Sequence, residues 1–322
     1  MTKDSFHLLD DVLRAVRLRS TVYFRAAFHS PWGMALPASE VANFHLVCKG
    51  KCWLTAASLD APIALEAGDM VLCPRGHAHE LRDLPEGQTI PAQELIKNPI
   101  SEPSSNAPPA GEQSIAFGGV GDTTSTLICG HYEYNREISH PLFDALPPVV
   151  CIKAGSGDGQ LNEQIVSMAN ALIGLDAERI GAAALDRLAE ALFICCVNAY
   201  SSGAEEERLS FIAAAQDKQI GQAISQIHQD IAREWHLQDL AEAAAMSRSV
   251  FSDRFRELVG VSPMVYVAKW RMLKAHQMLL ETSLPIARIS EQVGYQSEFA
   301  FAKAFKKNLG ITPGQARRTG TA

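Results

Sequence analysis

Two segments in the C-terminal third of the chain repeat one pattern fifty residues apart. Residues 247–263 read SRSVFSDRFRELVGVSP and residues 297–313 read SEFAFAKAFKKNLGITP. The aligned pairs of identical residues include Phe251–Phe301, Phe255–Phe305, Gly260–Gly310 and Pro263–Pro313. Upstream of these segments the offset becomes 49, because one additional residue, Gln296, precedes the second. Such repetition indicates one supersecondary unit used twice.

Each copy predicts a helix-turn-helix unit. A short helix with apolar residues at i and i+3 leads into a turn whose Ser can cap the next helix. The two Phe of that next helix are four positions apart, so they share a face and can pack on the short helix. Gly then ends the helix and Pro begins the following segment. The same signals in the same order predict the same fold for both copies.

A single long helix is expected between the copies. Residues 263–281, PMVYVAKWRMLKAHQMLLE, predict about nineteen helical residues, a length of roughly 28 Å. B-DNA presents its major groove on one side about every 34 Å. A rigid helix of this size can therefore hold two recognition helices in successive groove segments.

The charge distribution distinguishes the same region. The formal net charge of the chain is −7, yet residues 217–322 hold 14 basic and 10 acidic side chains. The preceding 216 residues hold 15 basic and 26 acidic ones. A basic domain joined to an acidic body is the asymmetry expected when only one domain meets phosphates. The negative total therefore does not exclude a nucleic-acid partner.

The first half of the chain predicts a β-barrel or sandwich. Between residues 41 and 81, short alternating or apolar runs are separated by the turns KGK, EAGD and PRG. A stretch rich in Pro, Gly and Ser follows, and we expect a flexible insertion over about residues 85–120. Strand character resumes at residues 125–134 and ends near residues 147–153.

After residue 159 the apolar residues take a helical period. One stripe is Leu161, Ile165, Met168 and Leu172, and another is Leu185, Leu188, Leu192 and Cys195. Two antiparallel helices here can cover the barrel or pair with a second subunit. We expect a multidomain α+β protein: a barrel sensor domain (1–158), a helical coupling or dimerisation segment with a linker (159–207), and an all-α double helix-turn-helix domain (208–322).

Composition argues against several other classes of protein. The length of 322 residues predicts two or three domains. There is no run of about eighteen apolar residues to span a membrane, and the N-terminus lacks the apolar core of a signal peptide, so we expect a cytoplasmic protein. None of the seven cysteines forms a CxxC pair, which argues against a disulfide scaffold or a zinc ribbon. We expect no cofactor.

The stretch GDMVLCPRGHAH carries the spacing G-x5-P-x-G-x2-H and ends near His79. It resembles the second motif of the cupin superfamily, in which a turn delivers a His into a barrel. The resemblance also implies a first motif with two more His and a Glu, but this chain has Pro37, Ser39 and Asn43 near those places. A catalytic metal needs about three protein ligands. A cupin metalloenzyme with an accessory helical domain is therefore only the alternative interpretation.

Two histidines are the candidate effector contacts. His45 lies two residues beyond Asn43, on the same strand face, so it can join His79 inside the barrel. His77 alternates with His79 and is expected to point outward. A cysteine redox switch is a further hypothesis, because lysines beside a thiol lower its pKa. Its cysteines would be Cys48, Cys52 and Cys129.

The C-terminal repeat resembles the DNA-binding domain of the AraC/XylS family of transcriptional regulators, over roughly residues 217–318. The motifs that carry the resemblance are MSRSVFSDRFRELVGVSP and VGYQSEFAFAKAFKKNLGITP. Together with FHLVCKGKCWL, GDMVLCPRGHAHEL and LICGHYEY, they are similar to the subgroup with a cupin-type sensor domain. The resemblance implies a cupin-like barrel, contacts from one monomer to two major-groove segments of double-stranded DNA, and activation of transcription with RNA polymerase as a partner.

Helical facing and the resemblance name the residues expected to meet DNA in the first recognition helix. Its two Phe and Leu258 face the interior, and the residues on or near the outer face are Arg248, Ser249, Ser252, Asp253 and Arg256. The base-reading positions of the family fall on Ser249, Ser252 and Asp253, although many members carry Arg in place of Asp253. Ala245 also replaces a Gly common in the first turn, which costs about 1 kcal/mol if its φ is positive.

The second recognition helix is expected to bury Phe301, Phe305 and Leu309. The outward residues of its N-terminal half, the part that enters the groove, are Glu298, Phe299, Ala302 and Lys303. Lys303 can reach guanine or phosphate, and Ala302 can contact a thymine methyl. Phe299 either contacts a methyl or packs against the preceding turn. Two further residues are expected to neutralise phosphates, Lys306 and Lys307.

These patterns predict a sequence-specific DNA-binding transcription regulator. We expect an activator that forms a homodimer and responds, through its barrel, to an unknown small-molecule or redox effector. A constitutive DNA-binding protein whose barrel is only a dimerisation scaffold is the second alternative.

Overall fold

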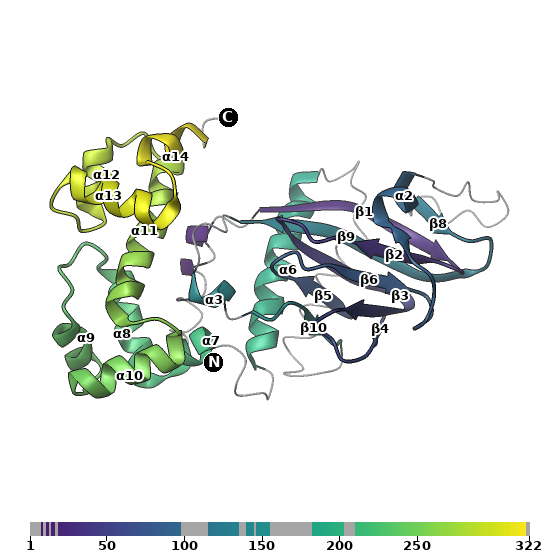
Figure 1. Cartoon of the computed structure of the whole chain (residues 1–322), viewed down its shortest axis with the longest axis horizontal. Coiled ribbons are helices and arrows are strands. Elements are labelled where there is room, and N and C mark those ends of the chain that lie inside the picture. Colours follow the sequence, from purple (N-terminus) through teal and green to yellow (C-terminus); the bar gives the residue numbers. More distant parts are fainter. Residues whose placement is uncertain are drawn as a thin grey trace. The chain divides into compact units, whose positions relative to one another are not determined.

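The computed structural model describes residues 8, 11–12, 14–16, 19–97, 115–134, 140–144, 146–154, 182–202 and 210–319. The chain divides into two compact units (Figure 1). The barrel unit comprises Arg19–Glu133 and Leu146–Ala204, and the helical unit comprises Met1–Leu18, Tyr134–Ala145 and Glu205–Ala322. None of the described helices is both long enough and apolar enough to cross a membrane.

The described part of the barrel unit is built on a ten-stranded sheet. Its strands are β1 (Arg19–His29), β2 (Gly33–Leu36), β3 (Ala42–Ala56), β4 (Ile63–Glu66), β5 (Met70–Cys73), β6 (His79–Arg82), β7 (Ile90–Pro91), β8 (Ile115–Gly118), β9 (Thr123–Glu133) and β10 (Val150–Ile152). Hydrogen-bonded neighbours follow the order β7-β2-β6-β3-β9-β1-β8, while β4 and β5 also pair with β3, and β10 with β5. This half-barrel confirms the strand-rich N-terminal fold predicted from the sequence.

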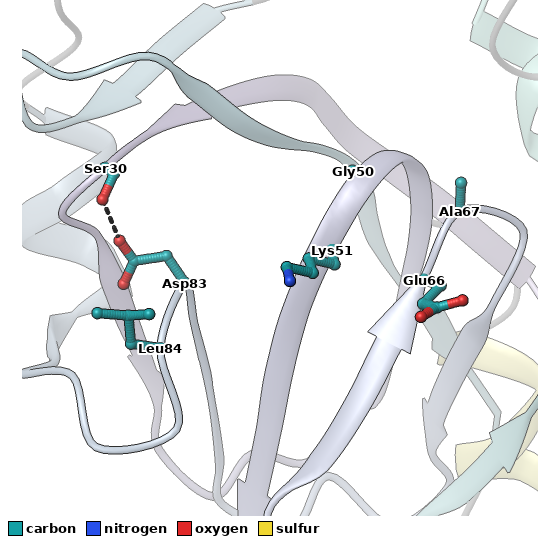
Figure 2. A pocket seen from close by; sticks show the side chains of 7 residues that line it. All are labelled: Ser30, Gly50, Lys51, Glu66, Ala67, Asp83 and Leu84. Carbon is teal, nitrogen blue, oxygen red and sulfur yellow. Dashed lines mark hydrogen bonds between the residues drawn. The ribbon is translucent and has the colours of Figure 1, made fainter.

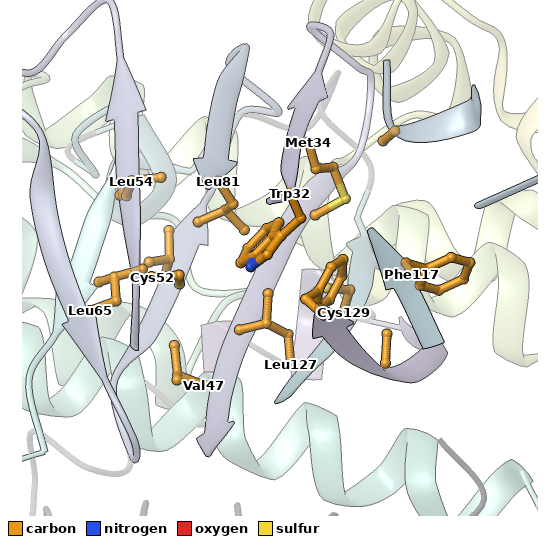
Figure 3. Close-up of a cluster of buried hydrophobic side chains, with 14 of the residues drawn as sticks. Trp32, Met34, Val47, Cys52, Leu54, Leu65, Leu81, Phe117, Leu127 and Cys129 are labelled. Atoms are coloured by element: carbon orange, nitrogen blue, oxygen red, sulfur yellow. The ribbon is translucent and has the colours of Figure 1, made fainter. Parts of the chain in front are cut away.

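Strand β3 joins the two parts of the sheet. Its first half pairs with β5 and β9, and its second half pairs with β4 and β6. Side chains from several strands fill the space inside (Figure 3). The largest buried side chains of this core include Phe28, Trp32, Met34, Leu54, Leu81, Phe117 and Leu127.

Helix α6 (Ala182–Ser202) packs on the sheet. The ring of Phe193 lies 4.9 Å from that of Tyr132, centroid to centroid. The Tyr132 hydroxyl donates a hydrogen bond to the Ala189 carbonyl at 2.9 Å. The segment of the second apolar stripe therefore forms a helix that packs on the barrel, with Leu192 buried and Leu188 and Cys195 half-buried. The first stripe, residues 161–172, lies outside the described residues.

The range expected to form a flexible insertion contains regular elements where the structure describes it. It includes β7, β8 and the helix α2 (Ala92–Lys97). Ala92, Leu95 and Phe117 are buried in the barrel core. Burial of these apolar side chains stabilises the segment against the barrel core. The average composition of the segment, rich in Pro and Gly, does not reveal them. Residues 98–114 lie outside the described residues.

The helical unit is organised around one long helix. Its helices are α3 (Pro141–Asp144), α7 (Ser210–Gln216), α8 (Lys218–Gln229), α9 (Leu237–Ala243), α10 (Arg248–Val259), α11 (Pro263–Glu281), α12 (Ile286–Gln292), α13 (Glu298–Leu309) and α14 (Pro313–Thr319). Helix α11 spans the residues that the sequence predicted. Figure 1 shows α9 and α10 at one end of α11, and α12 and α13 at the other.

Buried rings join three segments of the chain inside the helical unit. His228 of α8 stacks on Trp270 of α11 at 3.8 Å, and its Nε2 lies 2.7 Å from the Tyr266 hydroxyl. His140, just before α3, places its own Nε2 3.4 Å from the same hydroxyl. Asp11 approaches His228 Nδ1 to 3.5 Å. Residues that precede β1 and residues that follow β9 are therefore part of the core around α11.

Candidate nucleic-acid interface and sensor core

The turns of the two helix-turn-helix copies have the same hydrogen bonds. In the first, the Ala245 N–H donates to the Glu242 carbonyl at 2.9 Å, and in the second the Gly294 N–H donates to the Glu291 carbonyl at 3.0 Å. Both central residues have positive φ, +51° for Ala245 and +80° for Gly294. Ala245 is thus a non-glycine residue in the left-handed region, as the sequence comparison anticipated. Ala245 and Gly294 are 49 residues apart, whereas the helices that follow are 50 residues apart. Gln296 is the one additional residue, and it lies between the second turn and its helix.

The recognition helices also begin and end alike. Ser247 and Ser297 cap α10 and α13, each accepting a bond from the backbone N–H three residues later. Gly260 and Gly310 end these helices with φ of +82° and +69°. The paired Phe rings of both helices are fully buried, and their centroids are 5.5 Å apart in α10 and 5.6 Å apart in α13. The sequence repeat is therefore a structural repeat.

One interior residue of α10 differs from the expectation. Val259 is buried, whereas Leu258 is only half-buried. Val259 continues the spacing of four set by Phe251 and Phe255, and it matches the buried Leu309 of α13. The expectation that Leu258 faces the interior is thus met only in part, because Val259 takes the fully buried place at the end of the helix.

The candidate DNA contacts of α10 form an exposed face. Arg248, Ser249, Asp253 and Arg256 are exposed and Ser252 is half-buried. The adjacent Arg254 is held differently, since its guanidinium forms an ion pair with Asp217, the N-cap of α8. Burial alone would raise the pKa of the Asp217 carboxyl, but hydrogen bonds from the Ile220 N–H, from Arg254 and from the Gln219 N–H hold it below the usual value. Arg254 therefore fixes α10 against α8.

The candidate contacts of α13 are exposed as well, apart from the half-buried Ala302. The exposed ones are Glu298, Phe299, Lys303, Lys306 and Lys307. Phe299 is 82% exposed, so it does not pack against the preceding turn. Tyr295 of that turn contacts Phe301 instead, with ring centroids 5.7 Å apart.

Arg271 on α11 ties the two copies together, and sequence reasoning missed it. Its Nε donates to the Ile231 carbonyl at 3.1 Å, and a terminal nitrogen donates to the Arg233 carbonyl at 2.6 Å. The same guanidinium lies 5.8 Å from the ring centre of Tyr295. One side chain thus links the connection before α9 to the turn before α13. The signal available in the sequence was an Arg between the apolar residues Trp270 and Met272 of a predicted helix.

Inside the barrel unit, two histidines meet as the alternation of β3 predicted. His45 Nε2 lies 2.8 Å from His79 Nε2, and His45 Nδ1 lies 3.1 Å from Cys129 Sγ. His79 Nδ1 lies 2.8 Å from the His77 carbonyl, which can only accept. His79 Nδ1 must therefore carry the proton, so His45 Nε2 donates to His79 and the Cys129 thiol donates to His45. His77 itself is half-buried rather than exposed.

Burial keeps this chain of polar groups neutral. Burial lowers the pKa of His45 and of His79, and the neighbouring His79 lowers that of His45 further. Burial raises the pKa of the Cys129 thiol. Burial likewise raises the pKa of Cys52 to about 12. A thiol held protonated is a poor nucleophile, which weakens the hypothesis of a redox switch at these two cysteines.

Where the structure describes the barrel, it lacks the ligand set of a cupin metal site. Asn43, at the place of the motif's Glu, donates from Nδ2 to Ser39 Oγ at 3.0 Å. Within the described residues no group of three or more His, Cys, Asp or Glu side chains is arranged to hold a metal ion.

A pocket of about 710 Å³ lies elsewhere on the barrel unit (Figure 2). It is lined by Ser30, Gly50, Lys51, Glu66, Ala67, Asp83 and Leu84. The Ser30 hydroxyl donates to Asp83 at 2.6 Å within it. Neither histidine of the buried pair lines this pocket.

Comparison with known proteins identifies both units. A family model described as Cupin matches residues 7–201, and one described as a helix-turn-helix domain matches residues 240–319. An AraC-like transcription regulator of Streptomyces lividans is 30% identical over 315 residues, which are 96% of this chain and 97% of the relative. The HTH-type transcriptional regulator AlkR of Acinetobacter baylyi is 25% identical over 314 residues, 96% of this chain and 98% of that protein.

Solved structures of similar proteins include ToxT of Vibrio cholerae O395. It aligns over 95% of this chain and 98% of its own length, with 11% identity and a TM-score of 0.38. The family models and the sequence relatives carry the assignment. The chain belongs to the AraC-like family of transcription regulators, which are not enzymes, and combines a cupin domain with a helix-turn-helix domain.

Proposed function

We propose that the chain binds double-stranded DNA sequence-specifically through α10 and α13, which enter two adjacent major-groove segments. The observation that carries this proposal is the duplicated helix-turn-helix unit at the two ends of α11. Both copies have the same caps, the same turn and the same buried Phe pair. The 19-residue helix between them is about 28 Å long, close to the roughly 34 Å between successive groove segments on one side of B-DNA.

The exposed residues of the two helices divide into two roles. Base edges are read by the residues of the N-terminal halves, namely Arg248, Ser249, Ser252 and Asp253 in α10 and Glu298, Phe299, Ala302 and Lys303 in α13. Phosphates are neutralised by Arg256, Lys306 and Lys307, which position the helices without specifying sequence. The basic balance of the C-terminal region supports this division.

The barrel unit supplies regulation in this proposal. An effector reaches the barrel, with His45 and His79 as candidate contacts, and a homodimer then presents its DNA-binding helices so as to activate transcription by RNA polymerase in the cytoplasm. The helical segment 159–207 contributes to coupling or dimerisation between a sensor domain drawn from residues 1–158 and a DNA-binding domain of residues 208–322. Two parts of the first range, residues 1–18 and 134–145, belong to the compact helical unit.

A second route for coupling runs through β1 and β9. The two strands pair at Arg19 and Glu133, where both leave the barrel unit. The residues just beyond, before 19 and after 133, belong to the core around α11. A change in the pairing of β1 with β9 would therefore reach α11 directly along the chain.

The test begins with selection of bound duplexes from a random-sequence pool by the full-length chain. We expect protection of two groove segments about one helical turn apart. Lys303→Ala should relax the preference at one base pair. Its matched control, Lys306→Ala, should weaken all sequences and reduce the salt slope by about one. Absence of any enriched sequence would refute specific binding, and promoter output that ignores every candidate ligand would favour the constitutive alternative.

A further inference from the structure

We propose that Phe299 reads a thymine through its 5-methyl group, and that only the DNA segment met by α13 is read in this way. The inference rests on the proposed DNA-binding role of α13 and specifies what that helix recognises.

Phe299 is the aromatic side chain of α13 that the fold does not use. Phe301 and Phe305 of the same helix are 0% exposed, whereas Phe299 is 82% exposed. It is the second residue of the helix, two positions after the capping Ser297. The N-terminal part of a recognition helix is the part that contacts base edges. The ring therefore lies where a base contact is made.

The neighbours of Phe299 favour an apolar group on DNA as its partner. Ala302 and Lys303 are three and four positions further along, so all three side chains share one face of the helix. The short Ala302 leaves room beside the ring, and the lysine supplies a cation for the phosphates or guanine. In the major groove the 5-methyl of thymine is the apolar feature of the base edges. Phe299 and Ala302 thus offer an apolar surface to a thymine methyl, and Lys303 offers a positive charge to a neighbouring phosphate or guanine.

The first copy of the repeat has different side chains at the matched positions. Ser249, Ser252 and Asp253 occupy the places of Phe299, Ala302 and Lys303. The Ser249 hydroxyl lies 3.3 Å from that of Ser247. An acidic side chain in the groove accepts a hydrogen bond from the cytosine amino group. The matched positions of the two helices therefore present different chemistry to the groove, and the aromatic ring that this proposal assigns to the methyl is found in α13 alone of the two.

The experiment replaces thymines of a selected duplex, one at a time on both strands, by deoxyuridine, which lacks only the methyl group. At one position in the α13 segment we expect the affinity of the full-length chain to fall about fourfold, the worth of one buried methyl. Thymines in the α10 segment should tolerate the replacement. Phe299→Ala should bind the thymine and deoxyuridine duplexes equally, and Phe299→Leu should retain a preference for the methyl.

Lys306→Ala is the matched control. It should weaken binding to both duplexes but leave their ratio near fourfold. The proposal is overturned if the wild-type chain is indifferent to every deoxyuridine, or if Phe299→Ala keeps the sensitivity. If the wild-type chain shows no methyl dependence and Phe299→Ala loses affinity equally for both duplexes, the ring contacts DNA in another way, such as wedging between bases, and the proposal fails. Failure to select any duplex would instead refute the proposed function.

Discussion

Replacing Ala245 by Gly should stabilise the helical unit. Ala245 has a φ of +51°, and the equivalent residue of the second copy is Gly294. An L-residue in the left-handed region costs about 1–2 kcal/mol. Gly removes this cost. It also gives the unfolded chain more conformational freedom, which takes back about 0.4–1 kcal/mol of the gain in stability. Because Ala245 is exposed, its methyl adds little packing. The expected net gain is about 0.5–1 kcal/mol.

Hydrogen exchange of the α11 amides in the full-length chain provides the assay. A gain of this size should increase their protection about two- to fivefold, provided that they exchange through opening of the helical unit. DNA affinity should stay unchanged, because Ala245 lies in the turn and not on the recognition face.

Two substitutions in the opposite direction, from Gly to Ala, serve as controls for the change in protection. Gly260 has a φ of +82°, and a Cβ there would meet no atom within 4 Å. Gly260→Ala should therefore lose only the backbone contribution, about 0.5–1 kcal/mol. Gly294→Ala should cost clearly more, since its Cβ would lie 2.6 Å from an Arg271 nitrogen and 2.7 Å from the Ala232 carbonyl oxygen. The reasoning is refuted if Ala245→Gly lowers protection while Gly260→Ala also lowers it.

Three further predictions concern buried polar groups. Burial lowers the pKa of His140 and His228 in the folded chain, so below about pH 6.5 the unfolded chain binds more protons than the folded one. The free energy of unfolding should therefore fall by up to about 1.4 kcal/mol per pH unit for each histidine. Urea unfolding at pH 7.5 and 5.5 measures this fall, and equal midpoints would contradict it. Arg271→Gln should destabilise the helical unit by about 1–3 kcal/mol through lost bonds to two carbonyls, and Arg271→Lys should recover only part of this in the same unfolding assay. Burial raises the thiol pKa values of Cys52 and Cys129. Both thiols should therefore resist iodoacetamide at pH 8 until urea unfolds the chain. Rapid labelling of the folded chain would revive the redox hypothesis.

Features encoded within some twenty residues were predictable. The caps, the Phe spacing and the terminal glycines fixed both helix-turn-helix copies and the bounds of α11. The turn before β6 and the alternation along β3 placed His79 and His45 on facing positions. These signals are local, because a helix cap or a strand alternation depends on a few neighbouring residues.

The errors and omissions involve residues far apart in the chain. The insertion over residues 85–120 looked flexible by composition, yet Leu95 and Phe117 enter the barrel core. The sequence placed Arg271 between apolar residues, but it did not reveal which carbonyls, some forty residues away, the side chain would bond to. The sequence left open whether Phe299 packs on the preceding turn; in the structure Tyr295 of that turn contacts Phe301, and Phe299 stays exposed.

The sequence by itself determined the duplicated helix-turn-helix unit and the strand-rich N-terminal half, because repeats, caps and periodicities encode these features locally. Its motifs also carried the resemblance to the family. Only the tertiary structure decided that residues before β1 and after β9 join the core around α11, with His140 and His228 meeting at Tyr266. That core buries side chains from three distant segments at once, and the choice among such packings depends on how their shapes and hydrogen bonds fit together.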